Sequence, residues 1–166
     1  MSKPGIHPAN LFIFGQSLGG VNAIVAIAKN EFSKIRAIAI EGAFYSYRTE
    51  ARDMMISAVK KKIGNVPFLS LQIWPISFLS VTNSHSPGEF IDQVSPIPVL
   101  LIHCTKDALV SYHHSERLYE RAKNPKHLWK IKGCSHLQVF TDGQSKYGYR
   151  KRLVQFFKTL IEQKLE

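Results

Sequence analysis

The sequence is short of cysteine and of long apolar runs, and each shortage excludes a class of protein. Its two cysteines, Cys104 and Cys134, form neither a CxxC pair nor the framework of a disulfide-rich domain, so we expect a reducing, cytoplasmic environment. The longest helical apolar run, residues 21–28, is far shorter than the roughly 20 residues of a membrane span, and no integral membrane segment is expected. Residues 1–10 hold no apolar stretch of signal-peptide length, so nothing favours secretion.

Acidic residues are also few. The chain has 12 Asp and Glu against 22 Lys and Arg, which gives a formal net charge of +10. Nucleic-acid-binding proteins gather such charge into one patch or stripe. Here the basic residues are spread over residues 60–62, 123–132 and 146–152, so we expect no nucleic-acid partner. The pattern indicates a basic surface with some attraction for anionic membranes or substrates.

The order of apolar runs predicts an α/β protein. At 166 residues and 45% hydrophobic composition, residues 1–166 fit a single domain with one core. A strand over residues 11–15 precedes a buried helix over residues 18–30, and a second strand over residues 35–41 precedes a helix over residues 47–63. This βαβ progression predicts a parallel sheet of about four strands flanked by helices.

The rest of the chain continues the alternation. We expect a buried strand at residues 99–103, a helix at 112–122, a strand at 127–131 and a last helix at 147–162. Residues 66–81 are rich in bulky apolar side chains but are broken by Pro67 and Pro75, and their structure stays open. Residues 64–94 are a candidate cap over an acyl-binding pocket, with core helices as the alternative.

One motif carries chemistry. Residues following the first strand match G-x-S-x-G, the pattern of a nucleophile turn between a strand and a helix: Gly15, Gln16, Ser17, Leu18, Gly19 and Gly20. Glycine at positions 15 and 19 allows the strand and helix to approach closely and forces Ser17 into a strained conformation that exposes its hydroxyl. The backbone N–H of Leu18, at the start of the helix, is the candidate oxyanion donor. The alternative is that Ser17 only caps the helix.

Two downstream residues complete a candidate triad. Asp107 and His136 each lie in a loop after a predicted buried strand, and the carboxyl ends of parallel strands are where α/β sites form. A histidine takes the proton of a serine nucleophile, and a carboxylate orients that histidine, so the mechanism needs no metal or cofactor. Asp107 closing a turn, or His136 lying on the surface, are the alternatives. Asp142 is a competing acid, but it follows His136 and breaks the expected order.

The chain resembles the C-terminal part of the α/β-hydrolase superfamily, in particular the bud-emergence-type and abhydrolase-domain serine hydrolases. The similarity lies in the segments LFIFGQSLGG, EGAFYSYRTEA, SPIPVLLIHCTKDALVSYHHSERLYERA and LWKIKGCSHLQVF. The resemblance implies that Ser17 is the nucleophile, Asp107 the acid and His136 the base. It also implies about four further strands before the nucleophile strand, and these normally supply the second oxyanion donor.

Two functions follow from this resemblance. The first is a serine hydrolase that cleaves an ester, thioester or amide of a small molecule through an acyl-enzyme intermediate. The second is an inactive truncated hydrolase, or half of a split enzyme, that acts as a binding or assembly module. In both cases residues 11–15 would be an apolar sheet edge, and we expect a homodimer or an N-terminal partner chain to pair with it.

Overall fold

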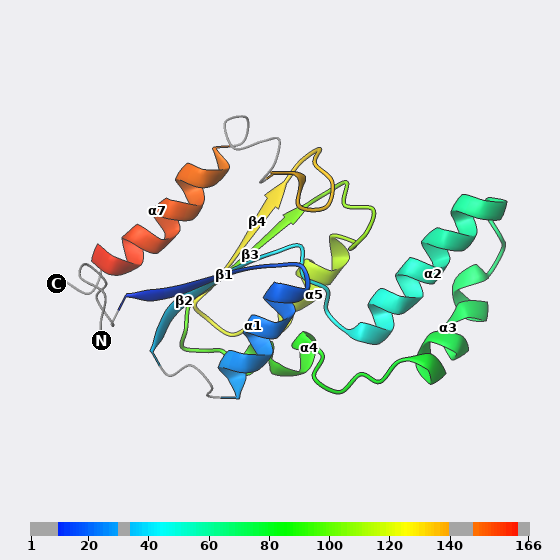
Figure 1. Ribbon diagram of the computed structural model, residues 1–166, viewed down its shortest axis with the longest axis horizontal. Coiled ribbons are helices and arrows are strands. Elements are labelled where there is room, and N and C mark those ends of the chain that lie inside the picture. The colour runs from blue at the N-terminus through cyan, green and yellow to red at the C-terminus, as the bar shows by residue number, and fades with distance from the viewer. Residues whose placement is uncertain (1–9, 30–33, 140–147, 163–166) are drawn as a thin grey trace.

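A four-stranded parallel sheet forms the centre of the protein (Figure 1). We describe residues 10–29, 34–139 and 148–162 of a computed structural model. The strands lie in chain order across the sheet: β1 (Leu11–Gln16), β2 (Ile35–Glu41), β3 (Val99–Cys104) and β4 (Lys126–Ile131). Every pair of neighbours is parallel, which confirms the predicted α/β class with about four strands.

Helices cover the sheet and extend beyond it. In chain order they are α1 (Leu18–Ala28), α2 (Tyr47–Ile63), α3 (Leu69–Ser80), α4 (Pro87–Phe90), the 3-10 helix η1 (Ile91–Gln93), α5 (His113–Arg121) and α7 (Tyr149–Glu162). None of the helices in the described ranges combines the length and the apolar character that crossing a bilayer requires.

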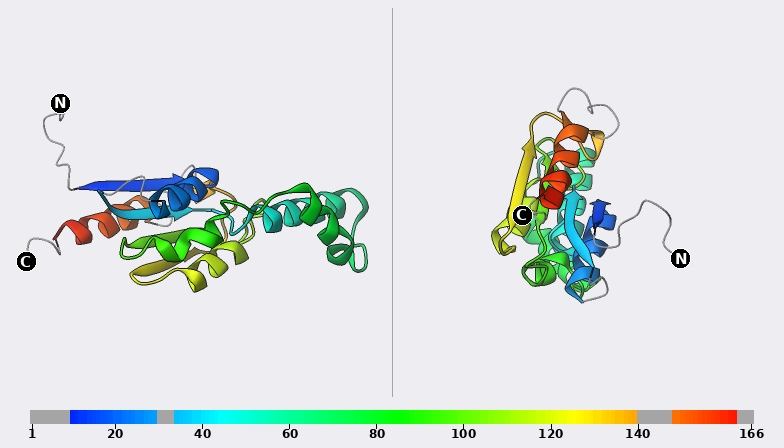
Figure 2. Two further views of the ribbon diagram at one scale, coloured as in Figure 1. Left: turned by 90° about the horizontal axis from the view of Figure 1, so that it is seen from below. Right: turned by 90° about the vertical axis from the view of Figure 1, so that its left-hand side faces the viewer.

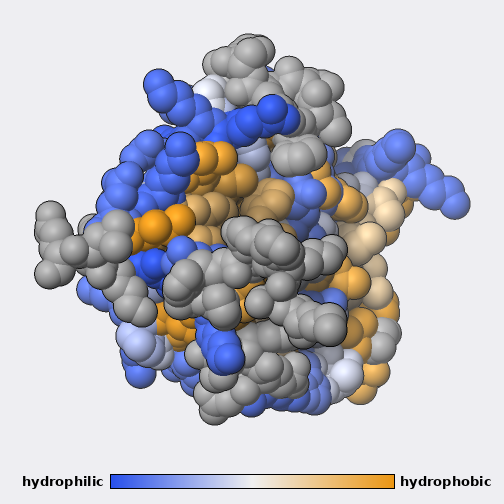
Figure 3. Space-filling view, turned by 60° about the vertical axis from the view of Figure 1, so that its left-hand side comes forward, coloured by the Kyte–Doolittle hydropathy of each residue, from blue (hydrophilic) through white to orange (hydrophobic). Residues whose placement is uncertain are grey.

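The two faces of the sheet have separate apolar cores, because helices pack on both sides of it (Figure 2). Alternation along β2 directs Ile38 and Ile40 into the core formed with α1, α4, η1 and α5. Ala39 points to the opposite core, where Trp129 stacks on Tyr149 at the start of α7 with ring centroids 5.3 Å apart. On the side of the molecule where α7 lies, apolar surface shows between hydrophilic side chains (Figure 3).

The candidate cap segment divides into two parts. Helices α2 and α3 form a hairpin that projects from the body of the protein (Figures 1 and 2). Residues 87–94 instead join the core beside α1, where Ile91 and Val94 are fully buried. The cap assigned to residues 64–94 stays a prediction, and the apolar residues at the end of this segment pack beside α1.

Strand β1 lies at one edge of the described sheet. It pairs with β2 on one side, and the order of strands gives it no second neighbour among the described residues. Leu11 is exposed at the start of this edge. Pairing of the edge with a second copy or with another chain stays a prediction.

Candidate active site

Ser17 occupies the turn between β1 and α1 with a strained backbone. Its φ of 49° and ψ of −122° lie in a region that residues with a side chain rarely adopt. A hydrogen bond of 2.8 Å from the Ser17 N–H to the Glu41 carbonyl holds the turn against β2. The Ser17 side chain makes no capping bond to α1. The hydroxyl is therefore left to face the carboxyl ends of the strands, and the capping alternative does not describe it.

The structure brings Ser17, Asp107 and His136 into one hydrogen-bonded chain. The Ser17 Oγ lies 3.2 Å from His136 Nε2, and His136 Nδ1 lies 2.7 Å from Asp107 Oδ2. Because a carboxylate accepts at Nδ1, that nitrogen carries the proton and Nε2 is free to accept from the serine hydroxyl. The histidine side chain is 16% exposed and the aspartate only 1%, so the base is reachable while its partner is shielded. Asp142 lies outside the described residues.

The two oxygens of Asp107 have separate tasks. Its Oδ1 accepts hydrogen bonds from the backbone N–H groups of Leu109 at 3.0 Å and Val110 at 2.8 Å, which closes a turn. Its Oδ2 faces His136. Burial alone would raise the pKa of Asp107, but hydrogen bonds from His103, His136 and the Val110 N–H outweigh it and hold the pKa below its ordinary value. The carboxyl is therefore ionised beside His136 at neutral pH.

His103 is a second histidine at Asp107 that the sequence pattern did not reveal. Its Nε2 lies 2.9 Å from the Val110 carbonyl and 3.3 Å from Asp107 Oδ2. Because a carbonyl only accepts, Nε2 carries the proton, and Nδ1 accepts from the Ser115 hydroxyl at 2.6 Å. His103 is completely buried. His103 and His136 thus both contact Oδ2, and His103 helps to hold the Asp107 carboxylate in place.

A cluster of polar side chains from Gln16, Glu41 and Tyr149 lies next to the turn that carries Ser17. The Gln16 amide and the Tyr149 hydroxyl each donate a 2.8 Å hydrogen bond to Glu41 Oε2. Burial, and then the Glu41 charge, raises the pKa of Tyr149 far above its ordinary value, so its hydroxyl remains a donor. The second oxygen of Glu41 has no hydrogen-bond partner among the described residues. Gln16, predicted only as part of the motif, thus ties the turn to the end of β2.

Cys104 and Cys134 form a disulfide, which corrects the expectation of a reducing environment drawn from their spacing. They meet because Cys104 ends β3 opposite Ile131 of β4, three residues before Cys134. The bond joins the loop that carries Asp107 to the loop that carries His136. A cytoplasmic location stays a prediction, but the cysteines no longer support it.

The close approach of strand and helix depends on Gly15 and Gly20 rather than on Gly19. A Cβ on Gly15 would lie 2.7 Å from the Gly20 Cα, and a Cβ on Gly20 would lie 2.6 Å from the Ile40 Cγ2. A Cβ on Gly19 would meet nothing within 4 Å. The predicted role of Gly19 in this approach therefore belongs to Gly20, because the residue that faces β1 and β2 is the third after Ser17.

This difference gives a paired prediction for the two motif glycines. We expect Gly15→Ala to destabilise the fold by about 1–3 kcal/mol or more, since the obstacle is backbone that cannot rotate away. Gly19→Ala should be neutral or slightly stabilising, because alanine favours the helix and the space is open. Urea unfolding followed by circular dichroism measures both variants. Equal losses of stability in the two would contradict the packing described here.

Acidic residues of α2 lie behind the triad. Glu50 and Asp53 each approach His114 Nε2 to 3.3 Å, while His114 Nδ1 accepts from the Tyr45 N–H. Neither the Glu50 oxygen nor His114 Nε2 has the alignment of a hydrogen bond. Burial raises the pKa of Glu50 to about 7, and the charges of Asp53 and Asp107 act in the same direction. The ionised form of Glu50 is therefore unfavourable in the folded protein.

The raised pKa predicts a pH-dependent effect of Glu50→Gln. A carboxyl whose pKa rises from 4.5 to about 7 on folding is held more tightly protonated in the folded state, so stability falls as the pH increases through this window. The variant should match the wild type at pH 4 and exceed its free energy of unfolding by about 1–3 kcal/mol at pH 8.5. Thermal unfolding at both pH values tests this, with Glu120→Gln on the exposed side of α5 as the matched control. A difference that does not depend on pH would refute it.

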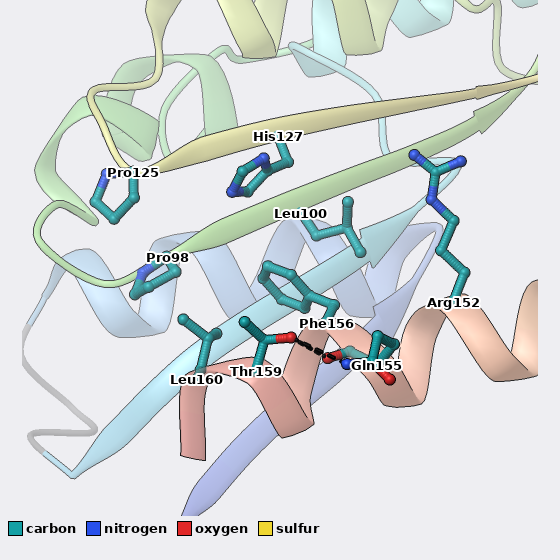
Figure 4. A pocket seen from close by; sticks show the side chains of 9 residues that line it. All are labelled: Pro98, Leu100, Pro125, His127, Arg152, Gln155, Phe156, Thr159 and Leu160. Atoms are coloured by element: carbon teal, nitrogen blue, oxygen red, sulfur yellow. Dashed lines mark hydrogen bonds between the residues drawn. The ribbon is translucent and has the colours of Figure 1, made fainter. Parts of the chain in front are cut away.

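Two of the cavities in the described residues lie against the sheet and its loops. One of about 440 Å³ lies between α2 and the loop after β3, and its lining includes Asp53, Asp107 and Leu109 but neither Ser17 nor His136. A second of about 540 Å³ lies between the sheet and α7, with Pro98, Leu100, Pro125, His127, Arg152, Gln155, Phe156, Thr159 and Leu160 around it (Figure 4). Because the two prolines precede β3 and β4, this cavity is at the opposite end of the strands from the triad.

The described ranges hold no group of three His, Cys, Asp or Glu side chains arranged to bind a metal. The arrangement that they do hold is a strained serine after a parallel strand, with an aspartate and a histidine at the carboxyl ends of later strands. These features, in this chain order, define an α/β-hydrolase fold, and the chain belongs to the α/β-hydrolase superfamily.

Solved structures of hydrolases share this fold. An acylaminoacyl peptidase of Pyrococcus horikoshii matches with a TM-score of 0.67 at 19% identity, over 94% of this chain and 25% of that chain. An esterase of Pyrococcus furiosus matches with a TM-score of 0.62 at 23% identity, over 90% of this chain and 53% of that chain. At these identities the likeness extends to the fold alone.

Relatives are also similar in sequence. The uncharacterized protein YfhR of Escherichia coli K12 is 34% identical over 154 residues, which are 93% of this chain and 47% of YfhR. Human alpha/beta hydrolase domain-containing protein 17B is 30% identical over 158 residues, which are 93% of this chain and 44% of the human protein. The chain thus spans about half the length of the curated relatives it matches. No family model matches the sequence.

Proposed function

We propose that this chain carries the catalytic triad of a serine hydrolase of the bud-emergence and abhydrolase-domain type, acting on an ester, thioester or amide. The observation that carries the proposal is the continuous contact from Ser17 Oγ through His136 to Asp107 Oδ2. Peptidase, esterase and lipase neighbours with the same fold support hydrolysis as the reaction class.

The chemistry proceeds in two halves. Ser17 Oγ attacks the carbonyl carbon of the substrate while His136 Nε2 takes the hydroxyl proton, and Asp107 stabilises the resulting imidazolium. His136 then gives this proton to the leaving group, which departs and leaves the acyl group on Ser17 Oγ. Water attacks this acyl-enzyme while His136 takes its proton, and His136 returns that proton to Ser17 Oγ as the acid product leaves. The Leu18 N–H at the start of α1 would donate to the oxyanion.

Labelling by a fluorophosphonate tests the proposal, because this probe reacts with serines that a neighbouring base activates. The wild-type chain should be labelled, and Ser17→Ala and His136→Ala should not. Ser57→Ala, which changes an exposed serine of α2, is the matched control and should be labelled like the wild type. Labelling that survives in Ser17→Ala would overturn the assignment of the nucleophile.

The second candidate function is a binding or assembly module that lacks activity by itself. It is favoured by one observation, namely that the chain spans about half the length of its relatives. By resemblance, the remaining half supplies the second oxyanion donor and pairs with the edge of β1. A folded chain that is not labelled, but is labelled after a chain containing that half is added, would favour the split enzyme.

A further inference from the structure

The α2–α3 hairpin (Tyr47–Ser80) exposes most of the large apolar side chains found on the surface. Eight of the twelve exposed large hydrophobic residues in the described ranges lie on it: Met54, Ile63, Phe68, Leu71, Trp74, Ile76, Phe78 and Leu79. Their exposed fractions reach 76% for Phe68 and 84% for Leu79. Single exposed apolar residues are ordinary, but a contiguous group of this kind marks an interaction surface.

Helix α3 carries apolar residues on an exposed side as well as on the side that packs against α2. Leu69, Ile73 and Ser77 face α2 and are buried, which uses one stripe of the helix. Leu71, Trp74 and Phe78 follow at helical spacing on another stripe, and the rings of Trp74 and Phe78 stack with centroids 5.5 Å apart. Arg48 of α2 covers part of Phe78, but the exposed fractions of Leu71, Trp74 and Phe78 are still 69%, 55% and 48%, so the hairpin leaves a second, largely exposed apolar face on α3.

The charges of the hairpin define what can cover that face. Residues 54–88 contain no Asp or Glu, and they carry three consecutive lysines, Lys60, Lys61 and Lys62, at the end of α2. All three are exposed and lie next to exposed Ile63, at the tip of the hairpin. Further back, the Arg48 guanidinium lies 4.1 Å above the Phe78 ring. From residue 54 onward the hairpin is therefore both apolar and cationic.

We propose that the α2–α3 hairpin docks the protein on an anionic lipid surface, with the outer face of α3 in the interface and the lysine triplet among the headgroups. Lysine is depleted in the cores of protein interfaces but is typical of interfacial helices, where its stem lies along apolar groups and its ammonium reaches anionic lipid. A second copy is the poorer occupant, because the part of its hairpin from residue 54 onward would present the same positive charge and no acidic residue to pair with it. The hairpin begins six residues after β2 ends, so docking would bring the triad edge of the sheet near the lipid.

Tryptophan fluorescence of the 166-residue chain tests the proposal, because its two tryptophans lie on different surfaces. Trp74 is 55% exposed on α3, whereas Trp129 is buried against Tyr149. In Trp129→Phe, vesicles containing phosphatidylglycerol should shift the Trp74 emission to shorter wavelength, and brominated acyl chains should quench it. In Trp74→Phe, the same vesicles should leave the Trp129 emission unchanged. A Trp74 signal that anionic vesicles do not alter overturns the proposal.

Charge variants separate specific docking from general attraction. Changing Lys60, Lys61 and Lys62 to glutamine should weaken binding to anionic vesicles more than about tenfold in sedimentation, since each lysine near the surface contributes to it. The matched control changes Lys123, Lys132 and Lys151, three exposed lysines outside the hairpin, and should bind like the wild type. Equal losses in both triple variants, equal binding to neutral phosphatidylcholine vesicles, or a stable dimer that buries Trp74 in ultracentrifugation would each overturn it.

Discussion

Replacing Asp107 by asparagine is expected to slow the reaction of Ser17 with a fluorophosphonate about 10⁴-fold while the chain stays folded. The loss is expected because Asp107 Oδ1 accepts hydrogen bonds from the backbone N–H groups of Leu109 and Val110. An amide nitrogen cannot accept them, so the asparagine carbonyl must remain there. Its NH₂ group then replaces Oδ2 and faces the N–H of His136, 2.7 Å away.

This substitution reverses the direction of the hydrogen bond between residue 107 and His136 Nδ1. To avoid two opposed N–H groups, His136 must accept at Nδ1 and carry its proton on Nε2, where it can no longer take the proton of Ser17. His103 acts in the opposite direction, because its Nε2–H also points toward the oxygen that the NH₂ group replaces. We expect the two short hydrogen bonds from Leu109 and Val110 to outweigh this single contact of 3.3 Å, so the asparagine takes the unproductive orientation.

The same substitution at a distant aspartate provides the control. Asp92 on η1 is partly buried, its Oδ2 lies 3.7 Å from Arg121 Nη2, and Asp92→Asn should react at the wild-type rate. The rate is measured by quenching the fluorophosphonate reaction at successive times, and circular dichroism establishes that both variants fold. A loss below about tenfold for Asp107→Asn would contradict its assignment as the triad acid.

The strands and most helices could be predicted because local pattern and final packing agree. The run at residues 99–103 is apolar throughout, and β3 is buried at every position. The predicted bounds of the helix at residues 47–63 match α2, where Ser46 caps the first turn and Gly64 ends the last.

Helix α3 could not be predicted, because its local signals conflict. Pro75 removes a backbone donor from the helix interior, and apolar residues on several sides hide the periodicity that identifies a helix. The contact of its buried stripe with α2 determines the outcome, and a sequence pattern does not contain that contact. The same apolar excess is what leaves the exposed face described above.

The candidate site shows a similar division. Sequence order and position after strands depend on topology alone, and they point to Ser17, Asp107 and His136, which the structure brings together. Their catalytic roles stay a prediction. His103, Glu41 and Tyr149 have no such signature. Each acts through contacts made across the sheet or its loops, so only the folded arrangement reveals that Tyr149, 108 residues from Glu41, donates to its carboxylate.

The Cys104–Cys134 disulfide is likewise a contact that the sequence pattern did not reveal, and its removal is expected to lower the stability of the fold strongly. Reducing the Cys104–Cys134 bond opens a loop with a sequence separation of 30, for which loop-closure entropy gives a loss of about 3–4 kcal/mol. In a domain of this size that loss lowers the melting temperature by roughly 10 °C. Differential scanning calorimetry with and without tris(2-carboxyethyl)phosphine measures it. An unchanged melting temperature would mean that the two thiols are not paired in solution.

Reduction should affect activity much less than stability. Backbone hydrogen bonds from the Lys106 N–H to the Cys134 carbonyl, at 3.1 Å, and from the Thr105 N–H to the Ile131 carbonyl, at 2.9 Å, also join the two loops. These bonds keep Asp107 beside His136 below the melting temperature, so the labelling rate of Ser17 should fall less than about tenfold. A variant with alanine at both cysteine positions separates the two effects: it should melt like the reduced wild type and no longer respond to the reductant. If reduction instead abolished labelling of a chain that stays folded, the disulfide itself would be positioning the triad.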